Sequence, residues 1–446
     1  MRILEFEHKH FGVEDMKEIL PAMGHELTVI STPLILERTS EEFDRLFDSL
    51  IIGNNDSHSS NSYNNNCSNN NHYCNDNNYN DNNIYNNNNS NNNNSYCNTV
   101  VPDKHTKYDA VFTFNYSVVV SNCCNRHNIP YIAWVYDSPL LTIYSYTITN
   151  PCNHIFLFDS AQYIELKNGG IDTVYYMPLA ANTDRLDKLT LNEHIHEVFD
   201  SDISFVGSMY NEKGNFYDRI YDKLNPWARG YLDAIISAQQ NVYGMNFLED
   251  MLSGTPETNK ILAELMRVEP YTPNHDGIET PAYAYANYFL ARKVAQNERK
   301  ALLTAVSEHF KTKLYTHNQT PDMPHVINQG PIDFYDNMPY VFKCSKINLN
   351  ITLRSIKNGI PLRCMDIMGA GGFLMTNFQA DLLNHFVPDV DFVYFESKDD
   401  LISKCNYYLK HEDERIKIAA NGHKKVLQLH NYRTRLNEIF NVCGLM

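Results

Sequence analysis

Short apolar runs alternate with amphipathic segments over most of the chain, and this alternation predicts strands that are joined by helices. Because strands buried on both faces are apolar throughout, such runs with crossover helices between them favour a parallel sheet covered on both sides. In the first part of the chain this pattern predicts one Rossmann-like domain that ends near residue 185. Its predicted strands are residues 1–7, 25–31, 109–115, 130–137, 154–160 and 173–180.

A second unit follows the polar stretch at 187–200, which we interpret as a linker. It opens with a predicted strand and continues with a long helical region from about 215 to 310, where the pattern predicts no strand. The α/β alternation then returns and ends in three helices, so the second domain is expected over 200–446. Its predicted strands are residues 202–208, 312–317, 325–330, 347–353, 372–377 and 391–397.

Residues 54–98 differ from the rest of the chain, since about half of them are asparagine and almost none is aliphatic. Such a tract buries too little apolar area to offset the entropy of ordering it, which predicts a disordered insert. A role in interaction or aggregation is the alternative. In the helix expected before the tract, Thr39 and Glu42 have the spacing of a capping box.

Net charge and cysteine usage narrow the class of protein. The formal net charge is −16, which argues against nucleic acid or an anionic membrane surface as a partner. The 10 cysteines include no C-x-x-C pair, so neither a zinc site nor a disulfide framework is expected, and a reduced, cytoplasmic setting fits best. We find no secretory signal pattern and no apolar run of the roughly 20 residues that span a bilayer.

Ligands of open parallel sheets bind beyond the carboxyl ends of the strands, so the turns after the strands hold the candidate residues. After the strand at 202–208, Gly207 and Ser208 would let the backbone approach a phosphate, and Lys213 would supply a positive charge. A surface loop with a solvated lysine is the alternative. After the strand at 130–137, Asp137 would act as a base or orient an acceptor hydroxyl. Its alternative is an Asp-Ser-Pro turn.

The segment 347–377 combines a strand, a loop, a helix and a second strand. Pro361 suits the start of that helix, and Asp366 would accept hydrogen bonds from the two ribose hydroxyls of a nucleotide across a solvated cleft. Arg354 and Arg363 bracket the loop and would hold a pyrophosphate. The alternative pairs Asp366 with Arg363 inside the helix. A G-x-G-x-x-G fingerprint that opens a helix is absent, which disfavours a dinucleotide oxidoreductase.

These segments resemble the bacterial CgeB-like glycosyltransferases, known as spore maturation proteins. The resemblance spans nearly the whole chain outside the asparagine tract, and its most specific part is residues 345–377. It implies an α/β fold of the GT-B type, in which two Rossmann-like domains face a cleft, here with a helical insertion in the second. The matching stretches are YDAVFTFNYS, IPYIAWVYDSPL, HIFLFD, YYMPLAAN, DISFVGSMYNEK, SKINLNITLRSIKNGIPLRCMDIMGAGGFLMTNF and YYLKHEDERIKIAANG.

The resemblance also assigns roles to single residues. The superfamily has two acidic positions eight residues apart that straddle the donor. The second, which binds ribose, falls on Asp366, while the first, at the sugar hydroxyls, falls on Asn358, whose amide is expected to contact the donor sugar. In the superfamily's phosphate-binding pattern, the lysine is kept as Lys213 and the arginine is replaced by Ser208. Arg354 or Arg363 would supply the missing charge. Asp137 matches a position that faces the acceptor.

The sequence therefore predicts transfer of a sugar from a nucleoside diphosphate sugar, expected to be a UDP sugar, to a surface glycan or protein. The resemblance implies no bound metal and no cofactor, because the nucleotide sugar is a substrate. A non-catalytic GT-B-like protein of a spore or cell-surface layer is the second hypothesis. A nucleotide-sugar epimerase on the same fold is the third.

Overall fold

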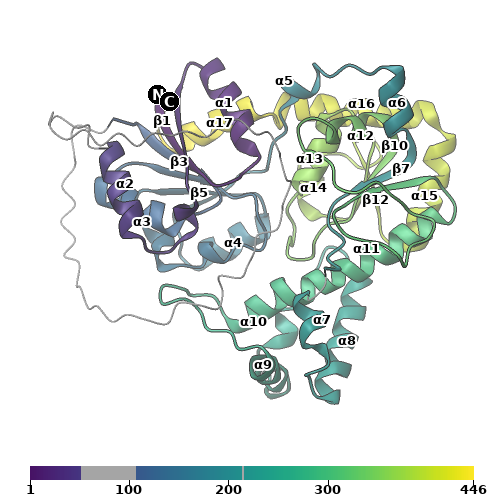
Figure 1. Cartoon of the computed structure of the whole chain (residues 1–446), viewed down its shortest axis with the longest axis horizontal. Coiled ribbons are helices and arrows are strands. Elements are labelled where there is room, and N and C mark those ends of the chain that lie inside the picture. Colours follow the sequence, from purple (N-terminus) through teal and green to yellow (C-terminus); the bar gives the residue numbers. More distant parts are fainter. Residues whose placement is uncertain (52–106, 213–214) are drawn as a thin grey trace.

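The structure, a computed structural model, describes residues 1–51, 107–212 and 215–446. These residues form two α/β domains side by side, with a group of helices extending below them (Figure 1). The asparagine-rich tract at 54–98 and the predicted phosphate ligand Lys213 lie outside the described residues.

The first domain contains a parallel sheet of six strands in the order β2-β1-β3-β4-β5-β6, which confirms the predicted alternation. One face packs against α2 and α3 and the other against α1. The strands are β1 Arg2–Glu7, β2 Glu26–Ser31, β3 Ala110–Phe114, β4 Tyr131–Trp134, β5 Asn153–Leu157 and β6 Val174–Tyr176. The helices are α1 Gly12–Ala22, α2 Glu41–Ile51, α3 Val118–His127 and α4 Ser160–Asn168.

The second domain repeats this design, with a parallel sheet in the order β12-β11-β10-β7-β8-β9. The expected fold class, two Rossmann-like α/β domains, is confirmed by these two sheets. The strands are β7 Ser201–Val206, β8 Thr312–Tyr315, β9 Ile327–Asn328, β10 Ser345–Asn350, β11 Leu374–Asn377 and β12 Val393–Phe395. The helices around it are α12 Met338–Cys344, α13 Leu362–Gly369, α14 Ala380–His385, α15 Lys398–Lys410 and α16 Glu412–Leu429.

The predicted helical insertion lies between β7 and β8 and has a hydrophobic core of its own. It contains α7 Phe216–Tyr221, α8 Pro226–Gln240, α9 Pro256–Val268 and α10 Pro281–Ala284, and it leads into α11 Ala291–Ser307. The linker is more ordered than its polar composition predicts, since α5 Thr183–Leu186 and α6 Glu193–Phe199 form within or beside it. In the described part of the chain we find no helix long and apolar enough to cross a bilayer.

The last helix, α17 Tyr432–Val442, corrects the expected domain boundary. It returns to the first domain (Figure 1) and buries Tyr432, Leu436 and Phe440 in the same cluster as Trp134 of β4. The first domain therefore includes the end of the chain. The periodicity of the helix predicts that one face is buried, but it does not indicate which domain covers that face.

The start of α2 also differs from its prediction. The backbone N–H of Phe43 donates to Ser40 Oγ at 3.2 Å, so Ser40 and not Thr39 caps the helix. The residue next to the expected cap therefore satisfies one of the free N–H groups of the first turn. Pro361 lies directly before the first residue of α13, which agrees with its predicted place at the helix start.

Glu5 in the interior strand β1 is fully buried, and neither of its carboxylate oxygens has a hydrogen-bond partner among the described residues. Burial, followed by repulsion from Glu7, raises the pKa of Glu5 well above its usual value. The folded state thus holds a proton that the unfolded state loses, so stability falls as the pH rises above the ordinary pKa of glutamate.

We expect Glu5→Gln to raise the melting temperature at pH 8 and to change it little at pH 4, because the variant removes only the ionisable group. A gain of about 1 kcal/mol corresponds to a shift of roughly 2–4 °C in a domain of about 150–250 residues that unfolds as one unit. Thermal unfolding at both pH values measures the effect. Equal shifts at the two pH values would contradict a proton-linked origin.

Candidate functional site at the domain junction

The carboxyl ends of the strands of both sheets meet at the junction of the two domains. Ser138, which follows β4, and Ser355, which follows β10, exchange two hydrogen bonds of 2.8 and 3.0 Å between hydroxyl and carbonyl groups. Because ligands of open parallel sheets bind beyond these strand ends, the junction is the candidate functional site.

Two carboxylates, one from each domain, accept hydrogen bonds from backbone N–H groups of the other domain. Asp159 of the first domain is buried and accepts the backbone N–H groups of Lys357 and Asn358, at 2.6 and 3.1 Å. Asp381 of the second domain accepts the backbone N–H of Ser160, the first residue of α4, at 3.0 Å. A Cβ atom at Gly359 would lie 2.9 Å from the Cα atom of Asp159, so a side chain at Gly359 would push the two domains apart.

This contact changes the interpretation of Asn358. Its side-chain Nδ2 donates to Ser160 Oγ at 3.2 Å, across the domain junction. Asn358 lies in the predicted loop, but the structure gives its amide a partner in the other domain. The predicted donor-sugar contact at Asn358 would require this hydrogen bond to break.

Asp366 lies on α13 at the junction, and only 7% of the residue is exposed. Its Oδ2 atom lies 3.2 Å from Nη1 of Arg363. The ion pair with Arg363, which was the alternative interpretation of the sequence, is therefore present. Burial raises the pKa of Asp366 to about 6, although the charges of Arg363 and Arg185 lower it. The expectation of a solvated carboxylate is therefore wrong, because Asp366 is buried close to Arg185 and to Asp15 of the first domain.

Arg185 and Asp15 complete this cluster of charges, and the sequence did not single them out. Asp15 on α1 accepts from Nδ2 of Asn182 at 2.7 Å and from Nε of Arg185 at 3.3 Å. The Arg185 guanidinium also lies 4.7 Å from the centre of the Tyr335 ring. These residues come from α1, the segment at α5 and the segment after β9, so only the fold brings them together. They place two cations, Arg185 and Arg363, beside Asp366.

Arg354 does not fit its predicted role at a pyrophosphate. Arg354 is only 5% exposed, and its Nη2 atom lies 2.9 Å from Oε1 of the buried Glu298 on α11. The guanidinium stacks 4.4 Å from the centre of the Tyr243 ring. A cation that is buried and neutralised in this way is not available to an incoming diphosphate.

Gly207 and Ser208 follow β7 at the junction edge, as predicted. The Ser208 hydroxyl donates to Glu212 and Asn318, each at 3.2 Å. Arg299, which sequence analysis missed, donates to the Ser208 carbonyl and, at 2.6 Å, to the Ile351 carbonyl. A buried arginine on α11 thus ties the loop after β7 to the loop after β10. Sequence gives no sign of this role, because α11 also carries many solvated charges.

Asp137 follows β4, which ends at Trp134, earlier than expected. It forms a reciprocal pair with Asn115 after β3. Nδ2 of Asn115 donates to Asp137 Oδ2 at 2.8 Å, and the Asp137 N–H donates to Asn115 Oδ1 at 3.0 Å. The structure thus shows that Asp137 orders a loop, and its role toward an acceptor stays a prediction.

His10, in the loop after β1, is a further candidate that sequence analysis missed. Its ring stacks on Phe114 with the ring centres 4.2 Å apart, and burial lowers its pKa to about 3. The Gly12 N–H donates to Nδ1 at 3.0 Å, so the neutral ring carries its proton on Nε2. That Nε2 is buried without a hydrogen-bond partner among the described residues. His10 therefore offers a free donor at the carboxyl edge of the first sheet.

A possible metal cluster lies elsewhere. Among the residues that the structure describes, only His196, Asp200 and Cys344 bring ligand atoms within 4.8 Å of one another. Cys344 ends α12, at the edge of the second sheet opposite the junction. Lys313 and Lys343 both add positive charge next to the Cys344 thiol, which disfavours a cation there.

Comparison with known proteins supports a glycosyltransferase-like domain. Residues 292–441 match the model of a family described as glycosyl transferase-like. No curated protein matches the chain. The matched range contains α13, and with it both Arg363 and Asp366.

Solved structures of similar architecture share little sequence with the chain. HepE of Anabaena in complex with UDP-glucose is 9% identical, with a TM-score of 0.49 over 100% of both chains. A glycosyltransferase from Rickettsia africae is 13% identical, with a TM-score of 0.45 over 99% of this chain and 97% of the other. Sucrose-phosphate synthase from Thermosynechococcus elongatus is 10% identical, with a TM-score of 0.46 over 100% and 98%.

Proposed function

We propose that the protein is a glycosyltransferase that moves a sugar from a nucleoside diphosphate sugar, a UDP sugar, to a surface glycan or a protein. The observation that carries the proposal is the position of Asp366. It lies in the segment that matches the glycosyl transferase-like family, and α13 presents it at the junction of two Rossmann-like domains. The resemblance to CgeB-like proteins supports a surface acceptor.

In this proposal each charged group has a defined task. Asp366 accepts hydrogen bonds from the ribose hydroxyls, and Gly207 and Ser208 let the backbone approach the diphosphate. Arg363 and Lys213 neutralise the charge that develops on the leaving diphosphate, which is worth several kcal/mol where water is excluded. Protein cations thus take the part that a metal ion plays elsewhere, so the proposal needs no metal.

Access to Asp366 is the main structural demand of the proposal. Arg185 and Tyr335 lie against the Asp366 side of the junction, and the Tyr335 hydroxyl donates to the Phe11 carbonyl of the first domain. A nucleotide can reach the carboxylate only if these contacts open. In this proposal, donor binding would require α5 or the segment after β9 to move.

Slow hydrolysis of the donor is the direct test of the proposal. Purified protein should release UDP from at least one UDP sugar even when no acceptor is present, because water can replace the acceptor. The non-catalytic alternative is favoured by one observation, the engagement of Asn358 with Ser160 across the junction. It predicts that no UDP sugar is hydrolysed. An epimerase would convert the UDP sugar without releasing UDP.

Asp137→Asn should reduce turnover about tenfold or more while UDP affinity stays within about twofold. The amide keeps the size of the side chain but loses the charge that would orient or deprotonate an acceptor hydroxyl. UDP release and calorimetric UDP titration measure the two quantities. Asn115→Ser is the matched control, since it removes the partner amide and leaves the carboxylate. If UDP binding collapses in Asp137→Asn, the residue holds the loop and has no direct role.

A further inference from the structure

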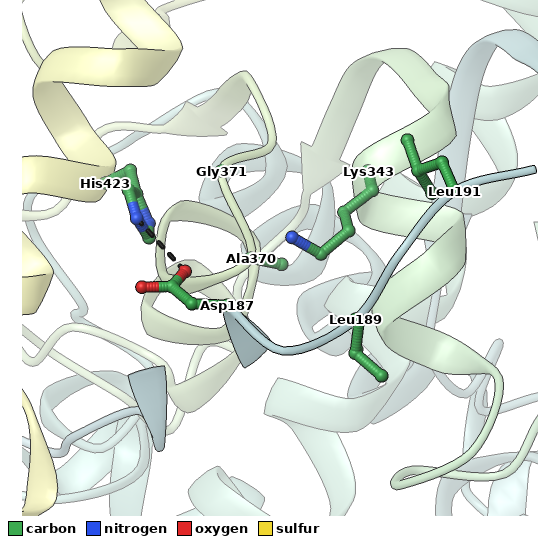
Figure 2. A pocket seen from close by; sticks show the side chains of 7 residues that line it. All are labelled: Asp187, Leu189, Leu191, Lys343, Ala370, Gly371 and His423. Carbon is green, nitrogen blue, oxygen red and sulfur yellow. Dashed lines mark ion pairs between the residues drawn. The ribbon is translucent and has the colours of Figure 1, made fainter. Parts of the chain in front are cut away.

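A pocket of about 370 Å³ lies on the second domain at the edge opposite the junction. The linker forms one wall with Asp187, Leu189 and Leu191, and the opposite wall contains Lys343 and the turn at Gly371 (Figure 2). Lys343 is on α12 directly before β10, and the turn precedes β11, so the pocket is at the amino ends of these strands. It is therefore separate from the candidate donor site.

The Asp187 carboxylate of this pocket already has a partner, His423. Nε2 of His423 lies 3.2 Å from Oδ1 of Asp187, and Nδ1 lies 3.0 Å from the Gly369 carbonyl. These contacts join the Asp187 carboxylate of the linker to α16 and to the end of α13.

Lys343 is the lysine that lines this pocket. Its ammonium group points into the pocket (Figure 2), and the structure gives it no hydrogen bond and no ion pair with any described residue. Burial lowers the pKa of Lys343, and the nearby Asp187 raises it again. The two neighbouring lysines differ, because Lys313 donates to the Val198 carbonyl at 2.6 Å and Lys346 to Asp202 at 2.8 Å.

We propose that this pocket binds a small organic molecule with one oxyanion group, a carboxylate or a phosphate monoester. The oxyanion would contact Lys343, which acts as a point charge, and the rest of the molecule would lie against Leu189 and Leu191. The volume falls in the range of small-molecule sites, about 300–1,000 Å³. Leu191 is 40% exposed in the structure, and a ligand would cover it.

The position of the pocket couples its occupant to the domain junction. One wall is the linker between the domains. The other directly follows α13, and the Ala370 N–H donates to the backbone carbonyl of Asp366 at 2.9 Å. A bound molecule would thus hold the linker against the helix that carries Asp366. The coupling to Asp366 rests on the proposed function, whereas binding of an oxyanion in the pocket does not.

Phenyl phosphate and benzoate are suitable probes because they share a ring and differ in the oxyanion, and benzamide is the neutral control. In calorimetric titrations of the full chain, we expect one-to-one binding of at least one oxyanion and no binding of benzamide. Lys343→Gln should weaken that binding at least tenfold. Lys346→Gln, which removes an exposed lysine three residues away, should leave it unchanged.

Two further variants keep the test decisive. Leu191→Glu changes an exposed position and should weaken oxyanion binding by repulsion, even if Lys343→Gln does not fold. Asp366→Ala should leave probe binding unchanged, which separates the pocket from the donor site. The proposal is overturned if neither oxyanion binds saturably, if Lys343→Gln and Leu191→Glu both bind like the wild type, or if only Asp366→Ala abolishes binding.

Discussion

UDP should bind the Asp366→Ala variant about 10- to 100-fold more weakly than the wild-type protein. A hydrogen bond to a charged group contributes about 1.5–3 kcal/mol, and each 1.4 kcal/mol is a factor of ten in affinity. Asp366 lies beside Arg363 and Arg185, so it can hold a ribose while the cations face the diphosphate. Calorimetric titration of UDP into the folded variant is the measurement. Unchanged affinity would show that Asp366 does not hold the ribose.

Removing the charge of Asp366 should weaken UDP binding but increase the stability of the folded protein. Burial raises the pKa of Asp366 from 3.8 to about 6, so the folded state binds more protons than the unfolded state between these values. Stability therefore falls as the pH rises through this window, by roughly 3 kcal/mol in total at 1.36 kcal/mol per pKa unit. Asp366→Asn, which keeps the size and removes the charge, should thus melt at a higher temperature at pH 7.

Together the two readouts distinguish a binding residue from a structural one. A donor-binding carboxylate gives weaker UDP binding and higher stability in Asp366→Asn, because the protein maintains a costly buried charge for its ligand. A carboxylate that only pairs with Arg363 gives lower stability and unchanged UDP affinity. At pH 4 the stability difference should disappear, since the wild-type carboxyl is then largely protonated in the folded state.

Much of the fold follows from local pattern. Parallel strands buried on both faces are short apolar runs, so the positions of β1, β7 and β10 are visible in the sequence. The helical insertion is visible because its apolar positions follow the helical period. The place where α17 packs is not visible, because a periodic apolar face indicates burial and does not identify the partner.

The candidate site was only partly predictable for a related reason. Ligands bind beyond the carboxyl ends of parallel strands, and this rule identifies the residues that follow such strands in sequence. They are Gly207, Ser208, Arg363 and Asp366. Partners such as Arg185 and Glu298 come from distant segments, and no spacing rule connects them to α13 or to the loop after β10. The sequence therefore identifies residues of the right chemical type and cannot tell which of them the fold has already paired.

Arg354 is the clearest case, and its replacement should have a large effect. Arg354→Met leaves Glu298 buried without its cation, which costs about 3–5 kcal/mol of stability. Burial already raises the pKa of Glu298, and Arg354 is the strongest group that opposes this shift. The variant should therefore lose stability most at high pH, and thermal unfolding between pH 5 and 8 measures the loss.

The double variant Arg354→Met/Glu298→Met should recover most of that loss, because a buried ion pair can often be replaced by apolar side chains at little cost. UDP affinity, measured on folded protein, should stay within about twofold of the wild type in both variants. The sequence motif predicts the reverse, in which Arg354 holds the pyrophosphate, UDP affinity falls at least tenfold and stability is unchanged. Recovery of stability in the double variant, together with intact UDP binding, would show that Arg354 has a structural role. Arg363 would then be the arginine that we expect to contact the diphosphate.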